Sequence, residues 1–308
     1  MWNYKFTVPE NKQVRVIVHT DCKNEADDQF AVAHHLMTPR FQVKGLIAGH
    51  FWKNPQTYGE EGTAKASYDE ILKVMDLMGV KEQYPVYMGA ARGLENEETP
   101  IDCEGVRFLI DEAMREDERP LYIACQGSLT DVASALLIKP EIAERMTVIW
   151  IGGGDYPVGG FEFNLMMDVH AVNVVFSSKV PVWQVPKSLY KVMAVSLAEL
   201  QLKVRPCGAI GKYLFEQMTD FNHYAAKYEM AWPHGEIWGL GDQGTIAVLM
   251  EELEKVSYDL IPAPRIAEDM TYIHGQKNRE IRVYKYLDAR LTLEDFFAKL
   301  AINYGKAE

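Results

Sequence analysis

What the chain has little of excludes several classes of protein. Only four cysteines occur among the 308 residues, and none forms a C-x-x-C pair, which argues against zinc-binding and thioredoxin-type motifs. Separated thiols are typical of a reducing compartment, and the first six residues lack the continuous apolar core of a signal peptide. No apolar run reaches the length of a transmembrane helix. We therefore expect a cytoplasmic, soluble protein with no membrane partner.

A basic surface is also missing. The formal net charge is −12, whereas a protein that binds a nucleic-acid polymer needs a basic face. This charge says nothing against a small ligand that carries little or no charge. Hydrophobic residues make up 48% of the chain and charged residues 25%, so a substantial buried core is expected and disorder is not.

No Pro/Gly/Ser-rich linker and no internal repeat divides the chain, so we expect one domain over residues 1–308. Short apolar, β-branched runs alternate with helical patterns, which predicts an α/β fold with a doubly wound, mostly parallel sheet. The expected strands are 14–18, 43–48, 86–88, 121–125, 146–151 and 180–185, and the helices between them are 29–37, 62–78, 105–115, 128–138 and 171–176. Later helices are expected at 197–204, 208–219 and 244–253, with residues 194–241 forming a helical cap over the sheet.

An acidic cluster follows the first expected strand, where parallel α/β sheets bind ligands. Asp21, Glu25, Asp27 and Asp28 lie within eight residues, together with Asn24. Helix capping explains one or two of these acids, because Asp is favoured at the N-cap and in the first turn. It does not explain all four, because adjacent like charges repel. A bound cation resolves the conflict, and hard oxygen ligands without a His or Cys cluster favour Ca²⁺ or Mg²⁺ over zinc.

The same segment resembles a known signature. Residues 19–28 read His-Thr-Asp-Cys-Lys-Asn-Glu-Ala-Asp-Asp. They resemble the D-T-D-x-G-x-D-D motif that follows the first strand of inosine–uridine-type nucleoside hydrolases, with His19 in place of the first Asp and two extra residues before the Asp pair. The spacing is closer to a divergent branch written T-D-x-x-N-E-x-D-D-Q. The resemblance implies a Rossmann-like nucleoside hydrolase fold and a calcium-dependent N-glycosidase.

Two further segments resemble the family in the same order. Residues 126–131, Gln-Gly-Ser-Leu-Thr-Asp, resemble its G-P-L-T-N turn, in which a backbone carbonyl binds calcium. This implies Gln126 as a ligand, and a turn capped by Ser128 is compatible with that role. Three glycines at 152–154, then Glu162-Phe163-Asn164 and Asp168, resemble the family's G-G, E-F-N and D-P pattern. Glu162 and Asn164 alternate around Phe163, so both are expected on one side of an extended segment, where the resemblance implies contacts with ribose hydroxyls. Exposed loop polarity is the alternative.

A last segment, Gly241-Asp242-Gln243, resembles the family's late H-D motif. The resemblance implies that Asp242 closes the calcium site, although an ordinary N-cap is an alternative for this residue. Gly241 stands where the family usually has the His that is often assigned to leaving-group activation. The usual acid is therefore missing, and His234 is our candidate to replace it.

The resemblance implies a complete site. Asp21, Asp28, Asp242 and the Gln126 carbonyl would hold Ca²⁺, and Asp21 would also be the general base that activates water. Sugar or base contacts are assigned to Asp27, Asn24, His50, Glu162, Asn164 and Trp238. Two of these residues have purely structural alternatives, because Trp238 can equally pack the cap and His50 can equally be a hydrogen-bonded loop residue.

The leading function is therefore hydrolysis of a ribonucleoside to ribose and a free base. The altered acidic spacing and Gly241 also leave open a hydrolase of another N- or O-ribosyl compound, and Gly241 alone leaves open a non-catalytic ribose- or nucleoside-binding protein. The resemblance further implies a homodimer or homotetramer.

Overall fold

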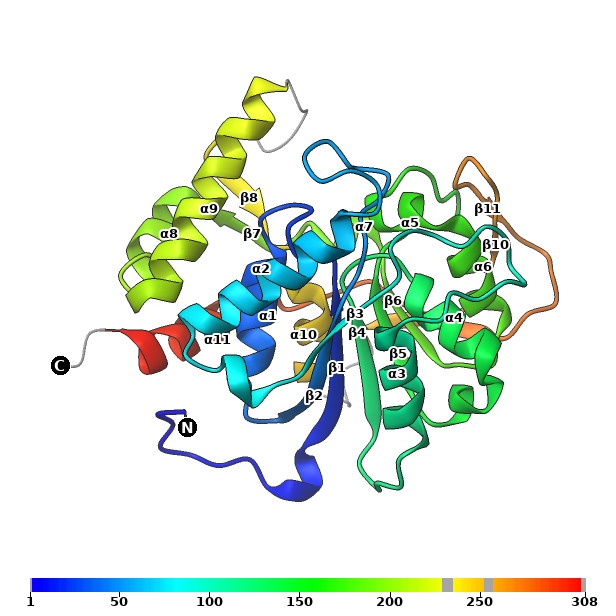
Figure 1. Cartoon of the computed structure of the whole chain (residues 1–308), viewed down its shortest axis with the longest axis horizontal. Helices are drawn as coiled ribbons and strands as arrows, with labels where there is room; N and C mark the ends of the chain where they lie inside the picture. Colours follow the sequence, from blue (N-terminus) through cyan, green and yellow to red (C-terminus); the bar gives the residue numbers. More distant parts are fainter. Residues whose placement is uncertain (1, 229–234, 252–256, 306–308) are drawn as a thin grey trace.

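The computed structural model describes residues 2–228, 235–251 and 257–305. Within them, eight strands form one central sheet in the order β3-β2-β1-β4-β5-β6-β12-β9 (Figure 1). Only the edge pair β12 and β9 is antiparallel. The strands are β1 (Val14–Thr20), β2 (Phe41–Ala48), β3 (Val86–Met88), β4 (Leu121–Cys125), β5 (Thr147–Ile151), β6 (Val182–Val185), β9 (Tyr258–Pro262) and β12 (Glu280–Tyr284).

The strand order reverses between β1 and β4. The chain first adds β2 and β3 on one side of β1, then returns to place β4 on the other side, where His19 pairs with Cys125. The loops that leave β1 and β4 therefore turn to opposite faces of the sheet and leave a crevice between them. Such a switch point is where doubly wound sheets bind ligands, and Asp21 and Gln126 are the first residues after these two strands.

Helices cover both faces of the sheet, which confirms the predicted doubly wound arrangement (Figure 1). One face carries α1 (Asp28–Met37), α2 (Thr63–Leu77), α10 (Gln243–Met250) and α11 (Ala289–Tyr304), and the other carries α3 (Glu104–Met114), α4 (Thr130–Ile138) and α6 (Val169–Ser177). Every residue of β1 is buried, as expected for a central parallel strand covered on both sides.

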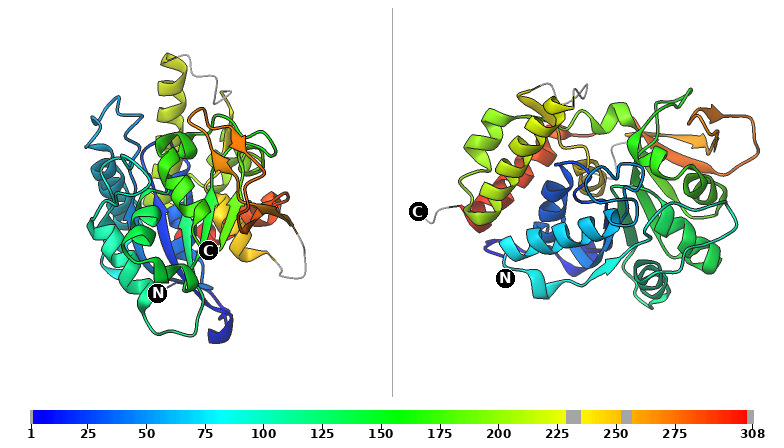
Figure 2. Two further views of the ribbon diagram at one scale, coloured as in Figure 1. Left: turned by 90° about the vertical axis from the view of Figure 1, so that its right-hand side faces the viewer. Right: turned by 45° about the horizontal axis from the view of Figure 1, so that its top comes forward.

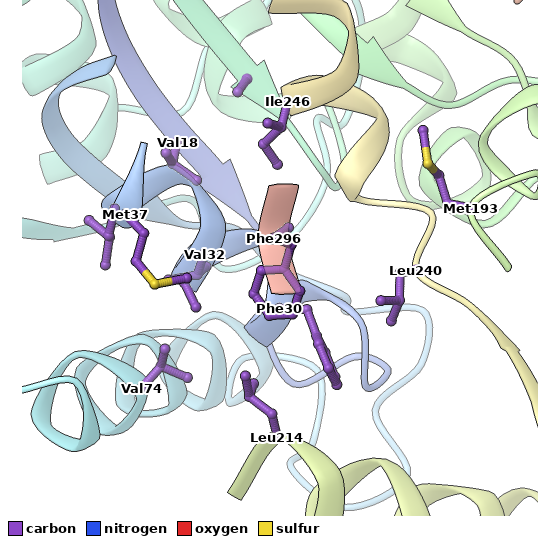
Figure 3. Packing of buried hydrophobic residues seen from close by; sticks show 14 of the residues in the cluster. Val18, Phe30, Val32, Met37, Val74, Met193, Leu214, Leu240, Ile246 and Phe296 are labelled. Carbon is purple, nitrogen blue, oxygen red and sulfur yellow. The ribbon is translucent and has the colours of Figure 1, made fainter. Parts of the chain in front are cut away.

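The core on the first face joins segments that are far apart in the sequence. Phe30 of α1 packs against Phe296 of α11 with ring centroids 5.8 Å apart, and Val18 of β1 and Ile246 of α10 lie in the same cluster (Figure 3). Leu214 of α9 (Gly208–Lys227) also reaches this cluster. The cap is therefore anchored to the main core by buried apolar contact.

The predicted cap, residues 194–241, is not purely helical. It holds α8 (Leu197–Lys203) and α9, but its ends pair as an antiparallel ribbon of β7 (Ala194–Ser196) and β8 (Ile237–Gly239). Helix α9 continues to Lys227, beyond the predicted end at 219, and contacts α2 and α11 (Figure 2).

The remaining elements are short or lie near the end of the chain. They are α5 (Phe163–Met167), α7 (Lys187–Tyr190), the hairpin β10 (Arg265–Ile266) and β11 (Tyr272–Ile273), and 3-10 turns at Glu10–Lys12, Lys81–Gln83 and Pro140–Glu144. Helix α10 ends at Met250, earlier than predicted, and residue 253 lies outside the described residues. None of the described helices is long and apolar enough to cross a membrane.

Candidate metal and substrate site

A cavity of about 480 Å³ opens at the carboxyl ends of β1, β4 and β5, at the switch point of the sheet. Nine of the residues assigned to the site from sequence line it: Asp21, Asn24, Asp27, Asp28, Gln126, Glu162, Asn164, Trp238 and Asp242. His50 is not in the cavity wall, and His234 lies outside the described residues. Segments that span more than 200 residues of sequence are thus brought to one place.

Four buried aspartates form the floor of this cavity. One carboxylate oxygen each from Asp27, Asp28 and Asp242 lies within 4.8 Å of the others. Asp21 joins them, because it and Asp242 both interact with the carboxylate of Asp28. All four residues are at most 7% exposed. The first turn of α1 supplies the pair, the end of β1 supplies Asp21, and the start of α10 supplies Asp242.

Four carboxyl groups that are buried close together are costly to ionise unless a cation balances their charge. Burial, with repulsion from Asp28, raises the pKa of Asp27 to about 7, and burial raises the pKa of Asp28 to about 6. Burial and the neighbouring carboxylates also raise the pKa values of Asp21 and Asp242 well above the usual range. Within the described ranges, no lysine, arginine or histidine forms an ion pair with any of the four. A divalent cation with hard oxygen ligands fits this donor set.

Helix capping does not account for the cluster. Asp27 and Asp242 occupy the N-cap positions of α1 and α10, but neither side chain accepts a capping hydrogen bond. In contrast, the N-cap side chains of Glu162, Asp168 and Asp288 each accept a backbone N–H of their own helix. Asp27 instead accepts the backbone N–H of Asp242, at 3.3 Å. The two carboxylates therefore point toward each other's segments rather than into their own helices.

Gln126 ties β4 to α10 at the edge of the cluster. Its backbone N–H donates to His19 O at 2.8 Å, and its side-chain Nε2 donates to Asp242 O at 3.3 Å and Thr245 Oγ1 at 3.0 Å. The side-chain Oε1 is buried and has no hydrogen-bond partner among the described residues. An unpartnered buried oxygen in the wall of a carboxylate cavity is a further donor atom that a cation can use.

Asp21 is held by its neighbours. Asn24 Nδ2 donates to Asp21 Oδ2 at 3.0 Å, and Asn54 Nδ2 donates to Asn24 Oδ1 at 2.8 Å. Gly127 packs directly against this carboxylate, because a Cβ added there would lie 3.0 Å from Asp21 Cγ. The two extra residues of the β1–α1 turn thus place Asn24 beside Asp21, with Lys23 in the left-handed region at φ 108°.

Glu162 and Asn164 reach the cavity from a backbone conformation that differs from the predicted one. The expectation of an extended segment around Phe163 is wrong, because α5 begins there and Glu162 is its N-cap. Glu162 Oε2 accepts the N–H groups of Gly153 (2.8 Å) and Leu165 (2.9 Å). Asn164 Nδ2 donates to Ile151 O at 2.9 Å. Gly153 itself has φ 81°, so the glycine run is needed to aim its N–H at Glu162.

Tyr190 is a cavity residue that the sequence did not single out. Its hydroxyl donates to Glu162 Oε1 at 2.9 Å, and burial, with the charge of Glu162, raises its pKa well above the usual range. A Cβ added at Gly241 would lie 2.8 Å from Tyr190 Cδ2. The ring therefore fills the space beside Gly241. Its position shortly after β6 was the one signal in the sequence that could have found it.

His50 belongs to a polar layer outside the cavity wall. Its Nε2 lies 2.8 Å from Thr130 Oγ1 and 3.2 Å from Ser128 Oγ, and burial lowers its pKa to about 3. Ser128 is not the N-cap of α4, because Leu129 occupies that position. This arrangement is the hydrogen-bonded loop histidine that was the alternative for His50.

Trp238 packs within the cap and also borders the cavity. It lines the cavity but is only 3% exposed, and its ring meets Phe221 edge-on with centroids 5.5 Å apart. His19, which replaces the first Asp of the motif, lies 2.8 Å from Asp131 Oδ2 through its Nε2 and is fully buried.

This geometry defines a doubly wound α/β protein whose switch-point cavity carries a carboxylate cluster suited to a divalent cation. Residues 16–293 match the family model described as inosine-uridine preferring nucleoside hydrolase. Because the match covers most of the chain, the chain belongs to this family.

Individual relatives are more distant. A pyrimidine-specific ribonucleoside hydrolase, RihA, of Escherichia coli O1:K1 / APEC is 26% identical over 188 residues, which span 53% of this chain and 57% of that protein. RihA of Klebsiella pneumoniae (strain 342) is 24% identical, over 75% of this chain and 78% of that protein. Among solved structures, the purine-preferring ribonucleoside hydrolase from Gardnerella vaginalis superposes with a TM-score of 0.73 at 19% identity, over 93% of this chain and 98% of that one. That structural likeness shows the shared fold.

Proposed function

We propose that this protein hydrolyses the N-glycosidic bond of a ribonucleoside and releases ribose and a free base, with Ca²⁺ bound by Asp21, Asp28, Asp242 and Gln126. One observation carries the proposal: four buried carboxylates converge at the switch point, and no lysine, arginine or histidine of the described residues forms an ion pair with them. Membership of the family and the names of the relatives support the reaction. Because those names include both pyrimidine-specific and purine-preferring enzymes, the base is not assigned.

The cation, when bound, would orient a water molecule and sugar hydroxyls and make that water easier to deprotonate. Asp28, Asp242 and Asp21 would hold it, together with the backbone carbonyl of Gln126. The unpartnered side-chain Oε1 of Gln126 is a second oxygen that could serve. Asp21 is the proposed general base, since Asn24 fixes one of its oxygens and burial raises its pKa above that of a free carboxyl, which makes it a stronger base.

Asp27, Glu162 and Asn164 would bind the sugar, with Asn24 beside them. The bond to the leaving base weakens as positive charge builds on the ribosyl ring, and fixed carboxylates around the ring stabilise that charge. Glu162 is well suited to this, because three hydrogen bonds hold its carboxylate in place before substrate arrives. Trp238 is the proposed surface for the base.

Protonation of the leaving base remains with His234 as the proposed acid. Tyr190 is a second candidate that the geometry favours, because its hydroxyl holds a proton inside the cavity. The family resemblance also supports a homodimer or homotetramer, which sedimentation measures directly.

The test is reducing-sugar release from a panel of purine and pyrimidine ribonucleosides, with and without a chelator. We expect activity that is lost on chelation, restored by Ca²⁺, and reduced at least a hundredfold by Asp21→Asn. Asp288→Asn is the matched control, since Asp288 caps α11 outside the cavity. Activity that survives both chelation and Asp21→Ala would overturn the mechanism. Calcium-dependent ribose binding without turnover on any ribosyl compound would instead establish a binding protein.

A further inference from the structure

The cavity is lined by two lysines as well as by acidic residues, and the lysines are more exposed than the aspartates. Lys187 and Lys191 line it, from the segment that leaves β6, and they are half-buried and exposed respectively. The aspartates of the floor are at most 7% exposed. Charge in this cavity therefore changes sign between the buried end and the solvent side.

These two amines are not bound to the acids around them. Six carboxylates line the same cavity, yet neither Lys187 nor Lys191 forms an ion pair with any described residue. Lys187 Nζ donates to Phe161 O at 2.8 Å and lies 5.3 Å from the centre of the Phe161 ring. One contact fixes the amine while its other N–H groups remain available to a ligand.

The backbone that carries the lysines is part of the built site. Lys187 N donates to Gly153 O at 3.0 Å, and Tyr190, between the two lysines, donates to Glu162. The same segment that fixes the sugar-side carboxylate therefore also fixes where the amines stand. The start of α7 does not compete for an anion, because the N–H of Ser188 already donates to Asp155 Oδ1 at 3.1 Å.

We propose that the substrate of this site is a phosphorylated ribosyl compound, with its ribosyl group at the aspartates and its phosphate at Lys187 and Lys191. The inference rests on the proposed function and narrows its substrate class. An uncharged nucleoside offers neither amine an ion-pair partner, whereas a phosphate accepts charge-assisted hydrogen bonds from both, in competition with the attraction between Lys191 and Glu25. The cavity volume of about 480 Å³ lies within the range of sites that hold such molecules.

The binding test compares ribose with ribose 5-phosphate, measured by titration calorimetry on the calcium-loaded protein. We expect ribose 5-phosphate to bind at least tenfold more tightly, with a preference that weakens as salt rises. The double variant Lys187→Gln/Lys191→Gln should bind the two sugars about equally. Lys81→Gln, a change of an exposed lysine outside the cavity, should keep the preference. Equal binding by the unaltered protein, or a preference that persists in the double variant, would overturn the proposal.

The kinetic test compares uridine and inosine with their 5′-monophosphates. We expect kcat/KM to favour the monophosphates at least tenfold, mostly through KM, and the lysine variants to bring the ratio of kcat/KM for monophosphate and nucleoside close to one. Unchanged thermal unfolding shows that the variants are folded. Cleavage of nucleosides without a phosphate preference overturns this inference and leaves the proposed function standing. Tight ribose 5-phosphate binding without cleavage of any compound supports the phosphate site and overturns the proposed hydrolytic function.

Discussion

Asp27→Asn should make the cation-free protein more stable. In the folded chain the pKa of Asp27 is raised from 3.8 to about 7, mainly by burial and then by repulsion from Asp28. At about 1.36 kcal/mol per pKa unit, holding this group ionised at pH 7 costs about 4 kcal/mol. Asparagine removes that charge and keeps an oxygen for the N–H of Asp242. For a chain of 308 residues this gain corresponds to a rise in Tm of about 6 °C.

The gain should depend on pH in a defined direction. Between pH 3.8 and about 7, the folded protein retains a proton on Asp27 that the unfolded chain has already lost. Stability of the unaltered protein therefore falls as pH rises through this window, and the variant lacks that loss. The advantage of Asp27→Asn should be largest at pH 7 and close to zero near pH 4.

Bound Ca²⁺ should narrow the difference. A ligand at a hundred times its Kd stabilises the folded parent by about 2.7 kcal/mol, which is less than the gain of about 4 kcal/mol from the substitution, and the variant has one fewer of the three clustered carboxylates to attract the cation. Urea unfolding followed by tryptophan fluorescence, in chelator and in excess Ca²⁺, measures both effects. Asp288→Ala removes a true capping side chain and should cost about 1 kcal/mol in both buffers. A variant that is less stable than the parent in chelator at pH 7 would refute the charge argument.

Three further changes probe other parts of the molecule. His35→Gln should reduce the loss of unfolding free energy on acidification, measured by urea unfolding. Burial lowers the pKa of His35 to about 3, so between pH 6.5 and pH 5 only the unfolded chain takes up the proton. The parent should therefore lose about 2 kcal/mol of stability over this range, and the variant should not. Gly127→Ala should lower kcat at least tenfold with little change in unfolding, because the new methyl group displaces the carboxylate of Asp21; unchanged kcat would contradict the close contact. Tyr190→Phe removes a cavity proton and one hydrogen bond to Glu162, so nucleoside hydrolysis should fall about tenfold, and an unaltered pH–rate profile would count against Tyr190 as the acid.

The part of the fold that the sequence predicted best is the parallel core up to residue 185. The central strands β1, β4 and β5 are short apolar runs that are almost entirely buried, so their composition alone distinguishes them from the amphipathic helices around them. The later strands give no such signal. Strand β9 is an edge strand with only intermediate and exposed residues, and β10 and β11 are two residues each. Beyond residue 219, Ala225 is the one buried residue of α9, so the apolar periodicity fades there, which is why the end of the helix was placed too early.

The residues of the candidate site also fall into those that the sequence indicated and those that it did not. The aspartates were found because they follow strands or open helices, and the order of apolar strand, acidic residue and helix can be recognised in the sequence. Tyr190 and the two lysines were missed, because α7 has four residues and no periodic pattern. Their relevance comes from the fold, which brings the segment after β6 against Gly153, Glu162 and Gly241.

The long sequence separation within the aspartate cluster has a consequence for how the protein matures. Asp27 and the Asp242 N–H that it accepts are 215 residues apart, so a growing chain that has made β1 through β6 carries three of the four acids and still lacks the last. The proposed set of metal ligands can be complete only after α10 has docked against α1 and β5. Tight Ca²⁺ binding should then appear late in folding. In a refolding experiment, its appearance would report that α10 has packed against α1 and β5.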